Sequence, residues 1–272
     1  MYRVEGVEPF EAAPQELVLT LLGSYLHDRR GQMVWSGGLV ALLAELGFSE
    51  GAARIALARL ARRGLLERVR RGRQVHYALT KRTVDVLAEG DERLAGLGRG
   101  RTAGEWTVLW HAIPHDRRLE RERLVRRLRF LGFGSVQDAT WLAAHDREAQ
   151  VAELLRELDV TDHAGVLLGR PAASLDVRAF AARAWDLDRL AERYAAFADT
   201  FTRPVPENPA AAFALRTRLV HGYRQFLTQD PELPEELVPA PPRRAEAVRL
   251  FHDLYPALAP AAQRHFDEVT HA

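Results

Sequence analysis

The sequence predicts an α+β protein made of three consecutive parts, with boundaries at residues 14–98, 104–171 and 175–272. Three observations support this prediction. The first part contains an arginine-rich helix pattern followed by a hairpin pattern, the second alternates strand and helix patterns, and the third contains helix patterns alone. A chain of 272 residues, 47% of them hydrophobic, is large enough to form several cores.

The first part contains a helix whose ends and faces are both marked. Ser49 is a good N-cap, Glu50 suits the first turn, and Gly64 supplies the residue type that commonly ends a helix. Small and apolar residues recur between them with helical spacing, at Ala53, Ala56, Leu57 and Leu60. One face of Glu50–Arg63 is therefore expected to pack inward.

A hairpin follows this helix, with Arg71-Gly72-Arg73 as its tight, charged turn. The expected elements of the first part are helices at 17–25, 39–46, 50–63 and 83–97 and strands at 66–70 and 74–79. Gly47-Phe48 forms the turn between the second and third of these helices. This order predicts a winged helix-turn-helix in which Glu50–Arg63 enters a DNA major groove.

Charge favours a DNA partner for this part. Residues 34–82 contain nine arginines and one lysine against three glutamates, a balance of +7, whereas the whole chain carries +1 and the remainder therefore −6. The alternative is that the arginines only solvate a helical face. The expected contacts to double-stranded DNA come from the cap, the helix and the hairpin: Ser49, Arg54, Arg59, Arg62, Arg63, Arg70, Arg71 and Arg73.

Beyond the glycine-containing linker at Arg99-Gly100-Arg101, the second part predicts a ferredoxin-like domain. Its expected elements are, in order, a strand at 106–113, a helix at 119–131, strands at 133–136 and 141–144, a helix at 148–158 and a strand at 164–168. Small open sheets often pair through an edge or a face. This domain is therefore the expected module for a homodimer, which would bind an operator with inverted repeats.

Helices alone are expected in the third part, at 177–201, 210–227, 243–254 and 260–269. Breaks between them are predicted at Arg203-Pro204-Val205-Pro206, at the proline-rich residues 239–242 and at Pro256.

The sequence offers no catalytic residue, metal site or cofactor motif. It has no cysteine, which excludes disulfides and thiolate chemistry. His221 and His252 lie on different expected helices and could meet at a metal or serve as structural histidines. Met1–Phe10 does not resemble a secretory leader and no stretch is long and apolar enough to span a membrane, so a cytoplasmic protein without membrane contact is expected.

Aromatic residues indicate where a small effector would bind. Tryptophans are usually core residues, but a seam of them between the sheet and the later helices would suit a flat apolar ligand. The weak candidates for effector contacts are Trp106, Trp110, Trp141, His221, Tyr223 and Arg224, although packing is the simpler interpretation of the last three.

Three blocks of the sequence resemble the phenylacetate-pathway repressor family, PaaX. The first block is LVLTLLGSYL with Trp35 and LVALLAELGFSEGAARIALARLARRGLLE; the second is WTVLWHAIP, RLRFLGFGSV and TWLA. The third is LVHGYRQFLTQDPELPEELVP with RAEAVRLFHDLYPAL. The resemblance implies a winged helix, a middle domain similar to CRISPR-associated integration proteins, and a helical C-terminal domain.

The resemblance also implies a transcriptional repressor of aromatic-compound catabolism, released from its operator by an aryl-CoA thioester such as phenylacetyl-CoA. By analogy, Arg54, Arg59 and Arg62 lie on the family's recognition helix, and Arg71 and Arg73 lie on its wing. The alternatives are a regulator that senses another acyl-CoA or aromatic metabolite, and a metal-dependent nuclease built on the ferredoxin-like sheet. The expected first strand ends in His111-Ala112-Ile113-Pro114 without an acidic residue, which disfavours the nuclease.

Overall fold

The structure is a computed structural model that describes residues 10, 12–26, 28–98, 104–202 and 204–271. Three segments discussed above lie outside these ranges. They are residues 1–9, most of the segment that does not resemble a secretory leader, the linker at 99–101, and Arg203 of one predicted helix break. The chain divides into two compact units: unit 1 comprises Met1–Ala95, Ala196–Arg224 and Glu246–Ala272, and unit 2 comprises Gly96–Ala195 and Gln225–Ala245. The later helices therefore contribute to both units, and the three boundaries expected from the sequence stay a prediction.

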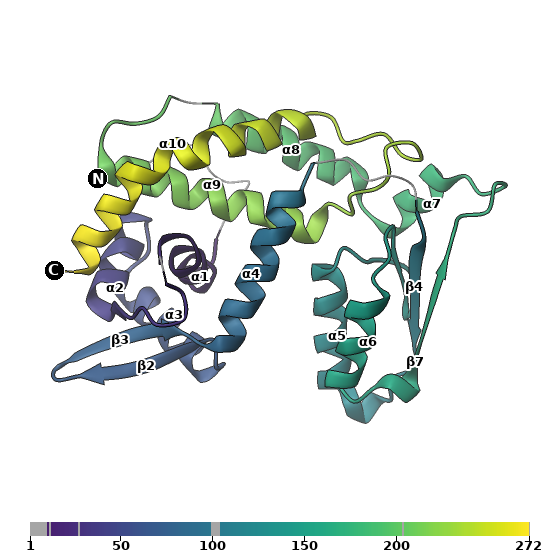
Figure 1. The fold of residues 1–272 in the computed structure, drawn as a ribbon, viewed down its shortest axis with the longest axis horizontal. Coiled ribbons are helices and arrows are strands. Elements are labelled where there is room, and N and C mark those ends of the chain that lie inside the picture. The colour runs from purple at the N-terminus through teal and green to yellow at the C-terminus, as the bar shows by residue number, and fades with distance from the viewer. Residues whose placement is uncertain (1–9, 11, 27, 99–103, 203, 272) are drawn as a thin grey trace. The chain divides into compact units, whose positions relative to one another are not determined.

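Unit 1 begins with a group of helices and a small antiparallel sheet (Figure 1). Its elements are α1 (Pro14–Tyr25), β1 (Val34–Trp35), α2 (Ser36–Glu45), α3 (Glu50–Arg62), β2 (Leu66–Arg71), β3 (Gln74–Leu79) and α4 (Lys81–Gly96). The strand order is β1-β3-β2, with Val34 paired to Tyr77 and Leu66 to Leu79. All the helices and both hairpin strands expected for this part are present.

The core of unit 1 also contains residues from α9 (Pro209–Gln229) and α10 (Arg244–Thr270). The ring of Tyr25 on α1 stacks on Phe266, with centroids 4.9 Å apart, and lies 5.4 Å from Phe213. The Tyr25 hydroxyl is also within hydrogen-bond distance of Thr217 Oγ1, at 3.2 Å. Residues nearly two hundred positions apart in the sequence thus form one interior.

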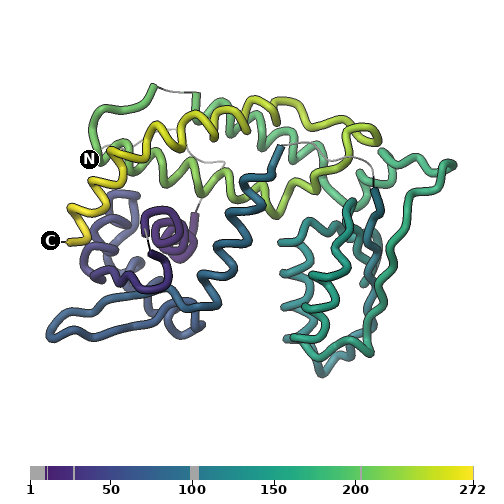
Figure 2. The backbone as a smooth tube through the Cα atoms, in the orientation of Figure 1, coloured from purple at the N-terminus to yellow at the C-terminus, as the bar shows by residue number. Residues whose placement is uncertain are grey.

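Two predictions about the later helices are wrong. The helix expected over residues 177–201 is divided into α7 (Val177–Ala184) and α8 (Leu187–Phe201), because Trp185 is extended and the Asp186 carboxylate accepts the Arg189 N–H at 3.0 Å, as an N-cap does. The break expected at Pro256 is absent: α10 is continuous and contains Pro256 and Pro260 (Figure 2).

The burial of apolar side chains explains how α10 continues through its prolines. A proline inside a helix costs about 3 kcal/mol, since it removes a backbone hydrogen bond and its ring crowds the preceding turn. Leu258, Ala262 and Phe266 on the same helix are fully buried. Their transfer from water offsets this cost, at about 1.5–3 kcal/mol for each large side chain.

Unit 2 contains the βαββαβ order that the sequence predicts. Its elements are β4 (Trp106–His111), α5 (Arg118–Phe130), β5 (Gly134–Gln137), β6 (Thr140–Ala143), α6 (Glu148–Glu157) and β7 (Ala164–Gly169), with short 3-10 helices at His115–Arg117 and Thr161–His163. The sheet order is β5-β6-β4-β7 and every neighbouring pair is antiparallel. Leu109 of β4 packs with Leu124 of α5 and Val151 of α6 on one face. The ferredoxin-like prediction is confirmed.

The opposite face of this sheet packs against α7 and the loop between α9 and α10. Trp106 and Leu142 from the sheet share a cluster with Ala181, Leu233 and Val238. This arrangement places residues 230–242 against the domain without any regular secondary structure longer than a turn.

A buried ionic network holds this loop in unit 2. Asp230 is 3% exposed; its carboxylate accepts hydrogen bonds from the Tyr194 hydroxyl at 2.6 Å and from Arg244 Nε at 2.8 Å. Burial, together with the negative charge of Asp230, raises the pKa of Tyr194 well above its usual value, so Tyr194 acts as a donor. The ring of Tyr194 stacks on Phe226 with centroids 4.0 Å apart.

We expect Asp230→Ala to lower the free energy of unfolding by about 3–5 kcal/mol, because the buried Arg244 would lose its close counter-charge and keep only the exposed Glu235 carboxylate at 3.7 Å. Urea unfolding followed by circular dichroism measures this loss. The control is Asp253→Ala, since Asp253 is an exposed aspartate of α10 and exposed substitutions usually change stability by less than about 0.5 kcal/mol. Equal midpoints for the two variants would contradict the assigned role of the network.

Candidate nucleic-acid interface

The helix α3 is built as the sequence predicts. The Ser49 side chain accepts the Ala52 N–H at 3.2 Å, and Gly47, with φ of +102°, makes the turn that precedes the cap. Gly64 follows the helix with φ of +66°. The inward side chains are fully or almost fully buried: Ala53, Ala56, Leu57 and Leu60. They fix α3 against α1 and α2.

The outward face of α3 presents Arg54, Arg59 and Arg62 to solvent, and Arg63, which caps the end of the helix, is exposed as well. Arg54 forms an ion pair with Glu50 at 3.2 Å, with both side chains more than 60% exposed. Such an exposed pair contributes little to stability, so Arg54 can exchange its carboxylate for a phosphate or a base at little cost. Gly51, which has no side chain, and Ala58, which has only a methyl group, lie on the same exposed side and leave room for close approach.

One residue of this face was not among the predicted contacts. Ile55 is 53% exposed, beside Arg54 and Arg59 on the same helix. A branched apolar side chain on this face is suited to contact a thymine methyl group if α3 enters a major groove. The sequence already indicated that Ile55 is exposed, because this residue falls outside the apolar repeat of the helix.

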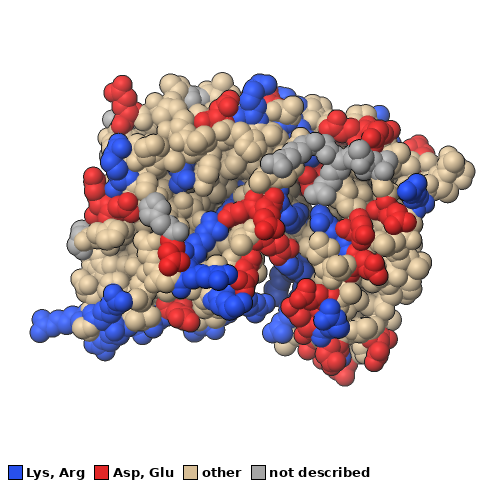
Figure 3. All heavy atoms as spheres, viewed as in Figure 1, with Lys and Arg blue, Asp and Glu red and all other residues tan. Residues whose placement is uncertain are grey.

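The hairpin carries the second set of predicted arginines. Arg71 pairs with Gln74 across a turn in which Gly72 has φ of +60°, so the turn itself consists of Gly72 and Arg73. Arg70, Arg71 and Arg73 are exposed, as is Arg68, which was not predicted as a contact. Lysine and arginine side chains gather over this hairpin and its tip (Figure 3).

The three tryptophans predicted as effector contacts do not share one face of the sheet, although two of them lie near Trp185: the rings of Trp106 and Trp185 are 6.5 Å apart, and Trp141 lines a cavity together with Trp185. Trp106 and Trp141 are buried and belong to clusters on opposite faces of the sheet. Trp110 is 44% exposed and its ring lies over Gly165, where a Cβ atom would be only 2.1 Å from it. Alternating strand residues point to opposite faces, which separates Trp106 from Trp141 across the β4–β6 pair.

The other predicted effector residues lie on α9 in unit 1 and contribute to its interior. His221 is buried, and Tyr223 stacks on Phe251 with centroids 3.8 Å apart. Arg224 donates to Asp91 at 2.7 Å. It lines a cavity of about 360 Å³ together with Arg29, Phe251 and His252.

Arg29 donates to the same Asp91 at 2.5 Å and also to the Gly23 carbonyl, so both arginines of this cavity are already paired. His252 is exposed whereas His221 is buried. Within the described ranges, no three His, Cys, Asp or Glu side chains form a group that could hold a metal ion.

No helix of the part of the chain that the structure describes is long and apolar enough to cross a membrane. Burial, and after it the charge of Arg121, lowers the pKa of His111 at the end of β4.

These features define an α+β protein that carries an arginine-rich helix with a basic hairpin and a separate ferredoxin-like sheet. Three family profiles match the chain in order: PaaX-like protein over residues 13–83, PaaX protein central Cas2-like domain over 99–181, and PaaX-like protein C-terminal domain over 185–268. The chain belongs to the PaaX-like protein family.

Two similar proteins bear on this assignment. The chain is 30% identical over 260 residues to the transcriptional repressor PaaX of Escherichia coli strain K12, which covers 90% of this chain and 80% of that protein. Among solved structures, the uncharacterized protein Rv0674 from Mycobacterium tuberculosis matches with a TM-score of 0.53 at 25% identity, covering 95% of this chain and 98% of that one.

We expect Ser49→Ala to lower the free energy of unfolding by about 1 kcal/mol, because the α3 cap would lose its side-chain acceptor. Thermal or urea unfolding measures the change. Ser174→Ala is the matched control, since Ser174 is exposed in a loop. A loss no larger than that of the control would show that the cap does not stabilise α3.

Proposed function

We propose that the chain is a transcriptional repressor that binds operator DNA through α3 and the β2–β3 hairpin. The observation that carries this proposal is the exposure of arginines on both elements, on a helix fixed by a buried inward face. The name of the E. coli relative, a transcriptional repressor, agrees with it. Exposed arginines next to a helix-turn-helix are the usual footprint of phosphate and base contacts.

The two elements would have different tasks. Arg54 and Arg59, on the outward face of α3, would read base edges in the major groove. Arg71 and Arg73, at the hairpin tip, would hold the phosphate backbone or the minor groove. The remaining predicted contacts would position the helix on phosphates: Ser49, Arg62, Arg63 and Arg70.

A homodimer would place two copies of α3 on an inverted repeat. The ferredoxin-like sheet supports this proposal, because its outer face exposes Trp110 (44%) and Leu167 (60%). Both side chains lie on the face of the sheet that α5 and α6 do not cover, given the β4–β7 register. Exposed apolar groups of this size are typical of a surface that another chain covers.

The resemblance to the PaaX family also supports a proposal for regulation: an aryl-CoA thioester, with phenylacetyl-CoA as the first choice, binds the protein and lowers its affinity for the operator of aromatic-catabolism genes. A different acyl-CoA or aromatic metabolite would act by the same principle. An effector releases a repressor only if it binds more tightly to the form that binds DNA less well.

The DNA-binding proposal is tested on sequences selected from a random duplex library by the purified full-length protein. We expect Arg54→Ala or Arg59→Ala to cost about 1–3 kcal/mol on selected sites and to relax base preference. Arg71→Ala or Arg73→Ala should lower the affinity for selected and random DNA alike. Each should also reduce the slope of log affinity against log salt concentration by about one, the value of one phosphate contact. Arg156→Ala, an exposed arginine on α6, is the control.

Identical losses on selected and random DNA for all four variants would contradict the division between reading and anchoring. Affinity for the selected sites that does not fall as salt rises would contradict the electrostatic basis of binding.

The effector proposal is tested by titrating the protein bound to a selected site with phenylacetyl-CoA, phenylacetate and CoA in a fluorescence anisotropy assay. We expect the thioester to lower DNA affinity at least tenfold, which requires only about 1.4 kcal/mol of coupling. Unchanged DNA affinity with all three compounds would remove aryl-CoA regulation and leave the DNA-binding proposal intact.

A further inference from the structure

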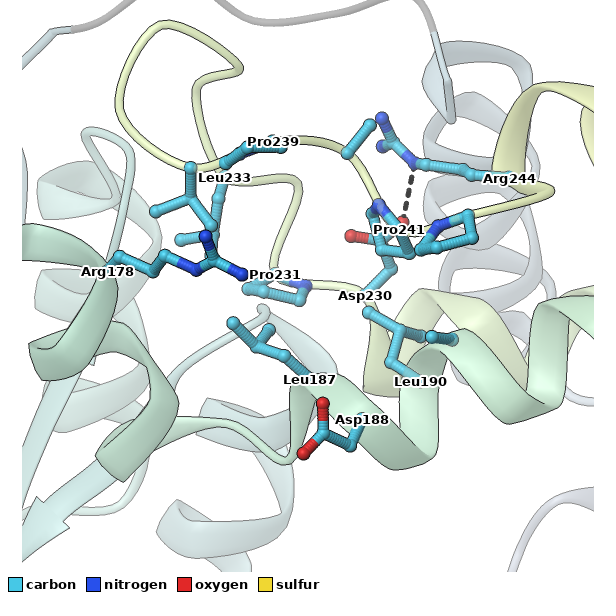
Figure 4. A pocket seen from close by; sticks show the side chains of 14 residues that line it. Arg178, Leu187, Asp188, Leu190, Asp230, Pro231, Leu233, Pro239, Pro241 and Arg244 are labelled. Atoms are coloured by element: carbon cyan, nitrogen blue, oxygen red, sulfur yellow. Dashed lines mark hydrogen bonds and ion pairs between the residues drawn. The ribbon is translucent and has the colours of Figure 1, made fainter.

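Unit 2 contains a cavity that the proposed DNA contacts do not use. It has a volume of about 330 Å³, which is at the lower end of ligand pockets. It lies between the α7 and α8 helices and the loop that follows α9 (Figure 4). Its walls are largely apolar, formed by Leu187, Leu190, Leu233, Val238 and the proline-rich stretch Pro239-Ala240-Pro241-Pro242.

One wall of this cavity carries two opposite charges that neutralise each other. Asp230 and Arg244 line it, and each satisfies the other through the buried ion pair at 2.8 Å. The proline-rich stretch restricts the backbone of the facing loop, so that loop loses little entropy when a ligand binds. A preformed apolar site of this kind favours a ring or a branched acyl group.

Arg178 supplies a charge at this cavity. It comes from α7, and its guanidinium group points toward Pro231 and Leu233 (Figure 4). Among the residues that the structure describes, Arg178 has no hydrogen-bond or ion-pair partner. It differs in this from Arg29 and Arg224 at the cavity of unit 1, which are both bound to Asp91.

Asp188 is a further charged residue that lines the cavity. It lies in the first turn of α8, and no ion pair joins it to Arg178 within the described ranges. The two groups therefore act separately on a ligand. An anion bound by Arg178 would gain from the guanidinium and lose from the carboxylate.

We infer that this cavity binds an anionic small molecule with an apolar acyl or aryl group, which fills the apolar walls while its anionic group meets Arg178. The inference rests on the proposed function, because it gives the effector of the repressor a place in the chain. A free aryl carboxylate and an acyl-CoA thioester share this chemistry. The first would place its carboxylate on Arg178, and the second its phosphates.

The position of Arg244 gives such a ligand a route to the DNA-binding unit. Arg244 is the first residue of α10, and only Arg243 separates it from the last lining proline, Pro242. The same continuous helix supplies Phe266 to the core of unit 1, where Phe266 stacks on Tyr25. A ligand in this cavity therefore contacts the start of a helix whose later residues support α1.

Isothermal titration calorimetry of the full chain with phenylacetate, phenylacetyl-CoA and CoA tests the inference. For a compound that binds the wild type, Arg178→Gln should lower the affinity at least tenfold. Asp188→Asn should bind the same compound as tightly as the wild type or more tightly. Ala191→Phe, which fills the cavity from α8, should abolish binding. Arg156→Gln is the charge-matched control on α6 and should bind as the wild type does.

Each variant is also tested for binding to the selected DNA, which shows that it is folded. If both Arg178→Gln and Ala191→Phe bind the compound with wild-type affinity, the proposed site is wrong. The proposal that an effector regulates the repressor would not be affected. Absence of binding of all three compounds to the wild type would overturn both the site and aryl-CoA regulation, while DNA binding would still test the repressor separately.

Discussion

Unit 1 depends on the packing of α1 between two helices that are distant in the sequence. Tyr25 at the end of α1 stacks on Phe266 of α10 and contacts Phe213 of α9, while Arg216 lies over its ring at 4.8 Å. Burial raises the pKa of Tyr25, so its hydroxyl keeps its proton. Because α1 in turn packs against α3, the orientation of the proposed reading helix rests on this aromatic cluster.

Polar contacts specify where the later helices dock on this unit. His265 of α10 lies 2.7 Å from the Glu45 carboxylate of α2. Gly38 on α2 lets α10 approach, since a Cβ atom there would be 2.8 Å from the Val269 carbonyl oxygen. Asp91 on α4 binds Arg29 and Arg224 together. Partly buried pairs of this kind add little net stability, but they penalise any other register of the helices.

Much of this architecture could be predicted locally, and the failures have a common cause. The cap at Ser49, the hairpin turn at Gly72 and the βαββαβ order all follow from short patterns. The continuity of α10 through Pro256 could not be predicted, because it depends on burial against other segments. The exposed arginines of α3 were predicted, but Arg178 was not, because its cavity is formed by a loop more than fifty residues away.

Arginine illustrates why residue type alone does not assign function in this chain. Arg59 is exposed on a helix with a buried opposite face and is suited to a polyanion. Arg224 is mostly buried and paired with Asp91, so its charge serves packing. Arg178 is exposed beside an apolar cavity with no partner among the described residues, an arrangement that favours a small anion with an apolar group. The partners of each guanidinium, which only the fold determines, therefore separate DNA contact, structural support and ligand binding.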